Sequence, residues 1–188
     1  MALTTLDPKT ALVVIDLQKG VVGLPTVHPT DSVVANAAAL TKAFRRHGLP
    51  VVLVRVTGAP SGRTEQAGLL SGGARPDDWA DLVAELDQQP EDHVVVKKTR
   101  GAFTYTDLDD HLKSIGVTQV VISGIATASG VESTANQAFE HGFNVTLAVD
   151  AMTDMSAEAH EYSLTRVFPR IGESGTTQEV LDLLDSTR

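Results

Sequence analysis

Three chemically distinctive positions follow apolar runs that we predict to be buried parallel strands. Asp16 ends the run ALVVI, Lys97 follows three valines, and a turn over residues 124–130 follows the run VVIS. Because ligands of open parallel sheets bind outside the carboxyl ends of the strands, these positions are candidates for one site. A carboxyl group beside an ammonium group can act there as a general acid or base. Asp150 follows a later strand and is a fourth candidate.

The stretch 119–134 combines a strand, a tight turn and the beginning of a helix. Amide groups in a first helical turn, at the positive end of the helix dipole, can hold an anion or a developing oxyanion. We expect the helix to begin near Thr127, with Thr127 or Ser129 as its cap and Glu132 completing a capping box. The central position is Gly130, so no obvious nucleophile stands there.

The rest of the chain must position these residues. Apolar runs predict strands at 11–15, 51–56, 93–96, 120–123, 144–149 and about 170–171. Capping residues, glycines and prolines delimit helices at 32–47, 107–115, 127–141, 157–168 and 177–184. This alternation predicts one α/β domain over residues 1–188, a three-layer, open, mostly parallel six-stranded sheet of Rossmann-like kind with helices on both faces. If the first, third and fourth strands lie centrally, Asp16 and Lys97 face one another above the turn.

Two stretches lack a regular pattern. Residues 19–31 mix glycine and proline and predict a loop, before a helix capped by Thr30 or Asp31. Residues 57–90 form a long excursion in which we expect one short helix near 79–86. Loops of this length in a compact domain usually have a function. We expect the excursion to lie over the carboxyl edge of the sheet and to carry much of the substrate specificity.

Composition excludes several classes of function. With 188 residues, 42% of them hydrophobic, the chain can bury the core of one domain. Its net charge of −9 provides no basic stripe, which argues against nucleic-acid and acidic-membrane partners. No apolar run reaches membrane-spanning length and no signal peptide is apparent, so we expect a cytoplasmic protein. The absence of cysteine removes disulfides, thiolate metal sites and cysteine nucleophiles.

Other catalytic templates do not match, and the candidates have ordinary structural interpretations. There is no G-x-G-x-x-G, P-loop, G-x-S-x-G or H-E-x-x-H motif, and the histidines are dispersed, so we expect no cofactor and no metal. An Asp after a strand is often a turn or cap residue. For Asp150 and Asp154 we favour that interpretation, with Asp154 or Ser156 capping the next helix. Of Lys97 and Lys98, strand alternation leaves one in solvent.

Three motifs occur in order along the chain. They are D-x-Q at 16–18, K-x-x-x-[SG]-A-F at 97–103 and G-x-x-T-x-x-[CG]-V-x-x-T at 124–134. Together with segments 11–18, 94–108, 120–154 and 166–181, they resemble the isochorismatase-like hydrolase superfamily, which includes nicotinamidases, N-carbamoyl amidohydrolases and related cysteine hydrolases. The resemblance covers nearly the whole chain. It implies an isochorismatase-like fold, a small-molecule substrate and a homodimer or larger homo-oligomer.

The resemblance also implies roles for individual residues. Asp16 takes the place of the catalytic acid/base and Lys97 that of the catalytic lysine. Gly130 takes the nucleophile position, where most members have Cys. A non-proline cis peptide is implied in the turn 125–127. The pocket for substrate or oxyanion would include Gln18, Phe103, Ala126, Thr127 and Ser129.

Gly130 decides which chemistry the resemblance allows. Members with Cys form a covalent thioester, which a glycine cannot form. Isochorismatases are similar in having Gly here, and in them the Asp protonates an enol carbon before water captures the oxocarbenium ion. They also use a Tyr where this chain has Ala126, and an Arg where it has Ala67 within the run 66–70. Two groups that bind isochorismate are therefore missing.

Three hypotheses remain open. The leading one is a cysteine-less hydrolase of a small organic molecule that uses Asp16 and Lys97 without a covalent step. The alternative is a non-catalytic ligand-binding or scaffold protein on the same fold, which would bind ligands without turning them over. The third is that Gly130 replaces a natural cysteine by engineering, which a gain of amidase activity in Gly130→Cys would support.

Overall fold

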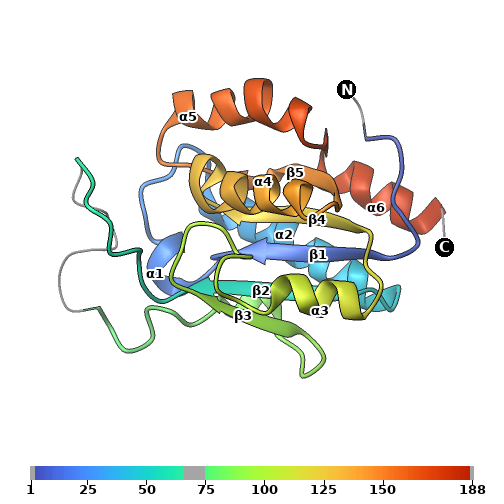
Figure 1. Ribbon diagram of the computed structural model, residues 1–188, viewed down its shortest axis with the longest axis horizontal. Helices are drawn as coiled ribbons and strands as arrows, with labels where there is room; N and C mark the ends of the chain where they lie inside the picture. The colour runs from blue at the N-terminus through green and yellow to red at the C-terminus, as the bar shows by residue number, and fades with distance from the viewer. Residues whose placement is uncertain (1–2, 66–74, 187–188) are drawn as a thin grey trace.

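A single sheet organises the computed structural model, which describes residues 3–65 and 75–186 (Figure 1). All pairings between its six strands are parallel, and the strand order is β3-β2-β1-β4-β5-β6. The strands are β1 (Thr10–Ile15), β2 (Val51–Val56), β3 (His93–Lys97), β4 (Gln119–Ile125), β5 (Asn144–Thr153) and β6 (Glu173–Gly175). This arrangement confirms the predicted open, six-stranded α/β fold.

Helices cover both faces of the sheet (Figure 1). The α-helices are α1 (Lys19–Val22), α2 (Thr30–Arg46), α3 (Leu108–Ser114), α4 (Glu132–Glu140), α5 (Ala157–Tyr162) and α6 (Thr177–Ser186). Shorter elements are the 3-10 turns η1 (Ala84–Leu86) and η4 (Phe168–Arg170) and the π-helical segments η2 (Thr127–Val131) and η3 (Ser163–Val167). Helices α2 and α6 pack on one face, while α3 and α4 pack on the other.

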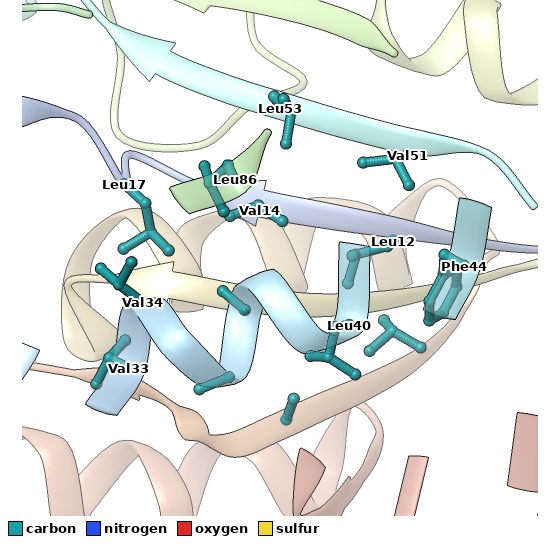
Figure 2. Close-up of a cluster of buried hydrophobic side chains, with 14 of the residues drawn as sticks. Leu12, Val14, Leu17, Val33, Val34, Leu40, Phe44, Val51, Leu53 and Leu86 are labelled. Atoms are coloured by element: carbon teal, nitrogen blue, oxygen red, sulfur yellow. The ribbon is translucent and has the colours of Figure 1, made fainter. Parts of the chain in front are cut away.

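The alternation of side chains along β1 explains why both faces need cover. Leu12 and Val14 point into the cluster that includes Leu40 and Phe44 of α2 (Figure 2). Ala11, Val13 and Ile15 point into the opposite cluster, with residues of α3 and α4. Successive strand side chains face opposite ways, so an unbroken apolar run is stable only between two layers. Full burial of each large aliphatic side chain contributes roughly 1.5–3 kcal/mol.

The strand order corrects one premise of the sequence analysis. Strands β1 and β4 are neighbours at the centre, but β3 lies at an edge, with β2 between it and β1. The order of parallel strands depends on the way in which the long crossover connections pack on the sheet. Local sequence patterns do not encode that packing. Lys97 therefore approaches Asp16 across an intervening strand, and not from a neighbouring one.

Several element boundaries also differ from the predictions. Residues 19–22 form the short helix α1 within the stretch predicted as a loop. The predicted helix 157–168 divides into α5, η3 and the beginning of η4, and the last strand lies at 173–175 because η4 occupies residues 168–170. Strand β5 continues to Thr153, with a register shift against β4 after Leu147. Asp150 therefore lies inside the irregular part of β5, and not at its end.

Helix caps were the least accurate predictions. The residue at the N-cap of α2 is Pro29 and that at the N-cap of η2 is Ala126, so the predicted caps at Thr30, Asp31, Thr127 and Ser129 are wrong. Glu132 forms no capping box and instead accepts a hydrogen bond from Ser163 Oγ at 2.6 Å. Ser156 does cap α5, since its Oγ accepts from the Ala159 amide at 3.2 Å.

The long excursion leaves the sheet at the carboxyl end of β2 and finally enters β3 at the opposite, amino end of the sheet (Figure 1). Residues 59–65 are exposed, whereas the returning part packs against the chain after β1, through hydrogen bonds from the Lys19 and Gly20 amides. The short helix expected near 79–86 is reduced to the 3-10 turn η1 at Ala84–Leu86. The run 66–70, with Ala67, lies outside the described residues. Among residues 3–65 and 75–186, no helix is long and apolar enough to cross a membrane.

Candidate active site

Asp16 stands at the carboxyl end of β1, with its side chain turned into the protein. It adopts a left-handed backbone conformation with φ of 52°, and its amide donates to the Val54 carbonyl at 2.9 Å. The residue is 5% exposed. Its Oδ1 is buried and has no hydrogen-bond partner within the part of the chain that the structure describes. A buried, unpartnered carboxylate oxygen is costly in a purely structural setting, so this atom is available to a ligand.

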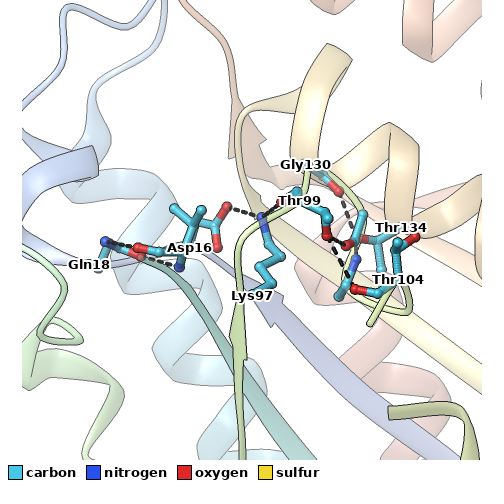
Figure 3. Close-up of polar contacts among 10 residues, drawn as sticks. Asp16, Gln18, Lys97, Thr99, Thr104, Gly130 and Thr134 are labelled. Carbon is cyan, nitrogen blue, oxygen red and sulfur yellow. Dashed lines mark hydrogen bonds and ion pairs between the residues drawn. The ribbon is translucent and has the colours of Figure 1, made fainter. Parts of the chain in front are cut away.

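Lys97 pairs with this carboxyl group from the edge strand. Its Nζ lies 2.7 Å from Asp16 Oδ2 and also donates to the Thr99 carbonyl at 3.2 Å (Figure 3). The Lys97 side chain is 2% exposed, whereas Lys98 is exposed, as strand alternation predicted. The long aliphatic stem of lysine explains how the ammonium group spans β2 to reach the acid.

The charge state of Asp16 reflects two opposing effects. Burial raises the pKa of its carboxyl group to about 6, and this outweighs the nearby Lys97 ammonium, which lowers it by Coulombic attraction and hydrogen bonding. The carboxyl group therefore exchanges its proton near neutral pH, where a general acid or base is most effective.

Gly130 faces the acid from η2. A Cβ atom at this position would lie 3.3 Å from Asp16 Oδ2 and 3.0 Å from Ile15 Cγ2. Gly124 makes this approach possible, because its φ of 119° suits glycine and a Cβ there would lie 2.0 Å from the Ile15 carbonyl oxygen. The expected non-proline cis peptide is present between Ile125 and Ala126. The turn thus brings the nucleophile position against Asp16.

Part of the donor capacity of this turn is already used within the protein. The Ala128 amide donates to Asp154 Oδ2 at 2.8 Å, and the Ser129 amide donates to the Ala126 carbonyl at 3.0 Å. Asp154 Oδ1 also accepts from the Ser156 amide, so Asp154 links the turn to the beginning of α5. The Ala128 and Ser129 amides are therefore already engaged within the protein.

A histidine pair supports the same turn from behind, and the sequence analysis missed it. His160 is 4% exposed, and its Nδ1 lies 2.8 Å from Thr127 Oγ1. The rings of His160 and His28 are 4.8 Å apart between centroids. Burial, followed by the charge of His28, lowers the pKa of His160. The neutral imidazole therefore holds the Thr127 side chain at ordinary pH.

The other residues predicted for the pocket occupy different surroundings. Gln18 is fully buried, and its side chain binds the Val56 amide and carbonyl and the Trp79 carbonyl. Phe103 packs beside the His141 and Phe143 rings, and Ala126 contributes to the core cluster that includes α2. Gln18 thus fastens β2 and the returning excursion next to Asp16. Asp150 is not brought to the site and instead binds Thr177.

The described residues offer no ready metal site. Within residues 3–65 and 75–186, no group of three or more His, Asp or Glu side chains is placed to hold a metal ion. The polar atoms that converge at the site are instead the carboxylate of Asp16, the ammonium of Lys97 and the backbone of η2.

Comparison with known sequences points to one family. An isochorismatase domain model matches residues 10–179. The isochorismatase family protein YwoC of Bacillus subtilis (strain 168) is 42% identical over 179 residues, which cover 93% of each chain. Enterobactin synthase component B of Escherichia coli (strain K12) is 31% identical over 157 residues, which cover 80% of this chain and 54% of that protein.

Solved structures agree with the sequence matches. An isochorismatase family protein from Burkholderia thailandensis aligns with a TM-score of 0.91 and 40% identity, over 96% of this chain and 98% of that one. N-carbamoylsarcosine amidase from Thermoplasma acidophilum aligns with a TM-score of 0.73 and 26% identity, over 90% of this chain and 96% of that one. The chain therefore belongs to the isochorismatase family of hydrolases.

Proposed function

We propose that this protein hydrolyses a small organic molecule by acid/base chemistry at Asp16, without a covalent intermediate. The observation that carries the proposal is the buried Asp16–Lys97 pair at 2.7 Å, which faces a Gly130 that offers no nucleophile. Lys97 would govern the charge of the carboxyl group and help to orient water. The unpartnered Oδ1 of Asp16 would receive the substrate or the attacking water.

The reaction class that suits these groups is the hydrolysis of an enol ether. Protonated Asp16 would give its proton to the terminal enol carbon, and the electrons of the C=C bond would form the new C–H bond. Water would then add to the resulting oxocarbenium ion and return a proton to the Asp16 carboxylate. This step regenerates the acid, and the hemiketal would then split into an alcohol and a carbonyl compound as its hydroxyl proton passes to the departing alkoxide oxygen.

The covalent route of the amidase relatives requires a side chain that is missing here. N-carbamoylsarcosine amidase shares the fold, but this chain has no cysteine at all. Gly130→Cys would place its Cβ near Asp16 Oδ2. Suppose that this variant hydrolyses amides or carbamoyl compounds and the natural chain does not. The residues around position 130 then retain the geometry of an amidase site, and the missing thiol alone prevents amide hydrolysis.

The substrate that we propose is an enol ether other than isochorismate. Ala126 stands where the resembled isochorismatases use a Tyr, and Ala67 stands where they use an Arg. Without the hydroxyl and guanidinium groups, the site would lose hydrogen bonds that fix the orientation of that substrate. Thr127 and Ser129 would contribute polar groups to a pocket of different shape.

The test is turnover by the natural chain and by Asp16→Asn on a panel of vinyl ethers, amides and carbamoyl compounds, with circular dichroism confirming the fold of each. We expect the natural chain to cleave at least one vinyl ether and Asp16→Asn to cleave none. An undiminished rate in Asp16→Asn would sink the proposal. Binding without turnover of any compound would favour the ligand-binding alternative.

Two further properties complete the proposal. We expect a homodimer or larger homo-oligomer, which sedimentation equilibrium would detect and a monomeric mass at all concentrations would contradict. A cytoplasmic location is the second, and fractionation of the source cells would test it.

A further inference from the structure

We propose that the Thr134 hydroxyl ties the Gly130 turn to the lysine loop, residues 98–107, and thereby fixes Lys97 against Asp16. Thr134 is a positioning residue in this proposal, because it acts through Lys97 and contacts no reacting atom. The role rests on the proposed function of the Asp16–Lys97 pair.

The geometry around the Thr134 hydroxyl carries the proposal. Thr134 lies in the first turn of α4 and is fully buried. Its Oγ1 donates to the Gly130 carbonyl at 2.7 Å and accepts from the Ala102 amide at 3.1 Å (Figure 3). A threonine that bonds the carbonyl four residues earlier in its helix is common. Here the same oxygen also binds a separate segment, so it joins the nucleophile position to the lysine loop.

The lysine loop connects this junction to the acid. Lys97 Nζ donates to the Thr99 carbonyl at 3.2 Å, and Thr99 Oγ1 donates to the Gly101 carbonyl at 2.8 Å. Gly101 is followed by Ala102, whose amide binds Thr134. A short path of backbone and hydrogen bonds therefore runs from the ammonium group that pairs with Asp16 to the hydroxyl that holds the turn.

Gln137 provides a second attachment of the lysine loop to α4, and this attachment does not involve Gly130. Its Oε1 accepts from the Phe103 amide at 3.1 Å, and its Nε2 donates to Thr104 Oγ1 at 2.6 Å. A Cβ atom at Gly101 would lie 2.2 Å from Gln137 Oε1, so the loop lies flat on α4. Gln137 thus secures the loop alone, whereas Thr134 secures the loop and Gly130 together.

A displaced lysine loop has a measurable consequence at Asp16. Lys97 is the charged side chain that contacts this carboxyl group, and it lowers a pKa that burial raises. Without the Thr134 hydroxyl, the Ala102 amide loses its partner and the loop can move away from α4. We expect the pKa of Asp16 to rise above about 6 as the ammonium group withdraws.

The experiment is a titration of the Asp16 carboxyl carbon by NMR in the full chain, which needs no substrate. Thr134→Val removes the hydroxyl and keeps the shape, and it should raise the pKa of Asp16, while Thr134→Ser should restore the natural value. Two controls remove other threonine hydroxyls. Thr106→Val removes a bond to the Ala102 carbonyl without contact to Gly130, and Thr41→Val removes a bond to the Ala38 carbonyl inside α2.

Both controls should leave the pKa of Asp16 within about 0.3 of the natural value. A natural value in Thr134→Val, or an equal rise in Thr106→Val, would overturn the proposal. If Thr134→Val does not fold, Thr134→Ala removes the same hydroxyl and is read in the same way. Failure of both to fold while Thr41→Val folds would show a purely structural role. Because the titration is independent of turnover, its outcome is separate from that of the proposed function.

Discussion

The carboxyl end of β1 and the irregular part of β5 each present an aspartate, and the two acids have opposite surroundings. Asp16 is buried, has one oxygen without a partner among the residues that the structure describes, and shares the other with Lys97. Asp150 is exposed, and its Oδ1 accepts from the Thr177 amide at 2.6 Å and from the Thr177 hydroxyl at 2.8 Å. Asp150 is a helix cap whose bonding capacity is used by α6, whereas Asp16 keeps capacity for a ligand. The difference lies in the partners of each acid, and not in its place after a run of apolar residues.

The largest expected difference between the two acids is in turnover. Asp16→Asn should lower the rate on a vinyl ether substrate by about 10²–10⁴-fold, because the general acid is lost while the shape of the side chain remains. Asp150→Asn is the matched control and should keep the natural rate. Steady-state kinetics on both variants would measure the contrast, and equal losses would mean that the comparison is wrong.

Removing the cation should destabilise the fold strongly and in a pH-dependent way. Lys97→Met leaves an ionised Asp16 buried alone, which we expect to lower the free energy of unfolding by roughly 3–5 kcal/mol above pH 7. The loss should shrink below pH 6, where Asp16 is protonated and needs no cation. Urea unfolding at pH 5 and pH 8 would test this; a loss that is constant with pH would contradict the pairing.

The pH dependence of the natural chain should reflect the titration of Asp16. If protonated Asp16 is the general acid, kcat/KM falls about tenfold per pH unit above pH 6. The folded pKa of about 6 exceeds the ordinary 3.8, so the stabilisation from this group is complete below pH 3.8 and is lost as pH rises to about 6. Between pH 3.8 and about 6, the free energy of unfolding of Asp16→Asn should lack this pH-dependent loss, whereas that of Asp150→Asn should retain it.

The smallest expected effect belongs to the capping acid. Asp150→Ala should lower the free energy of unfolding by about 0.5–2 kcal/mol, the usual cost of losing bonds at a helix N-terminus. Thermal unfolding would measure the loss, and turnover should not change. A defect in turnover without a loss of stability would place Asp150 in the reaction and erase its contrast with Asp16.

Local pattern in the sequence was sufficient for most of the sheet. Unbroken apolar runs predicted the first five strands, because a strand covered on both faces needs apolar side chains at every position, whereas β6 has no such run and was predicted in the wrong place. The positions of Asp16, Lys97 and the turn 124–130 after apolar runs predicted that they meet at one edge of the sheet, and in the fold Lys97 Nζ lies 2.7 Å from Asp16 Oδ2 while Gly130 faces the same oxygen.

Features that depend on distant partners could not be predicted from pattern. The edge position of β3 follows from the packing of whole crossovers, and the role of Thr134 follows from Ala102, thirty-two residues earlier. The same is true of His160, whose partner Thr127 lies thirty-three residues away. The final threonine of the third motif is Thr134 itself, a signal that was visible in the sequence but carried no assigned role.

Because Lys97 lies at the end of an edge strand, the proposed reaction at Asp16 depends on local opening of the sheet. Within the described part of the chain, β3 pairs with β2 alone, so it is held by one ladder of hydrogen bonds and frays more easily than β1 or β4. Each fraying event would carry the ammonium group away from Asp16, which would then lack the cation that we propose controls its charge and helps to orient water. Amide hydrogen exchange in β3 would therefore measure the largest fraction of molecules in which Lys97 is in place for catalysis. Tighter packing of this one strand would raise that fraction.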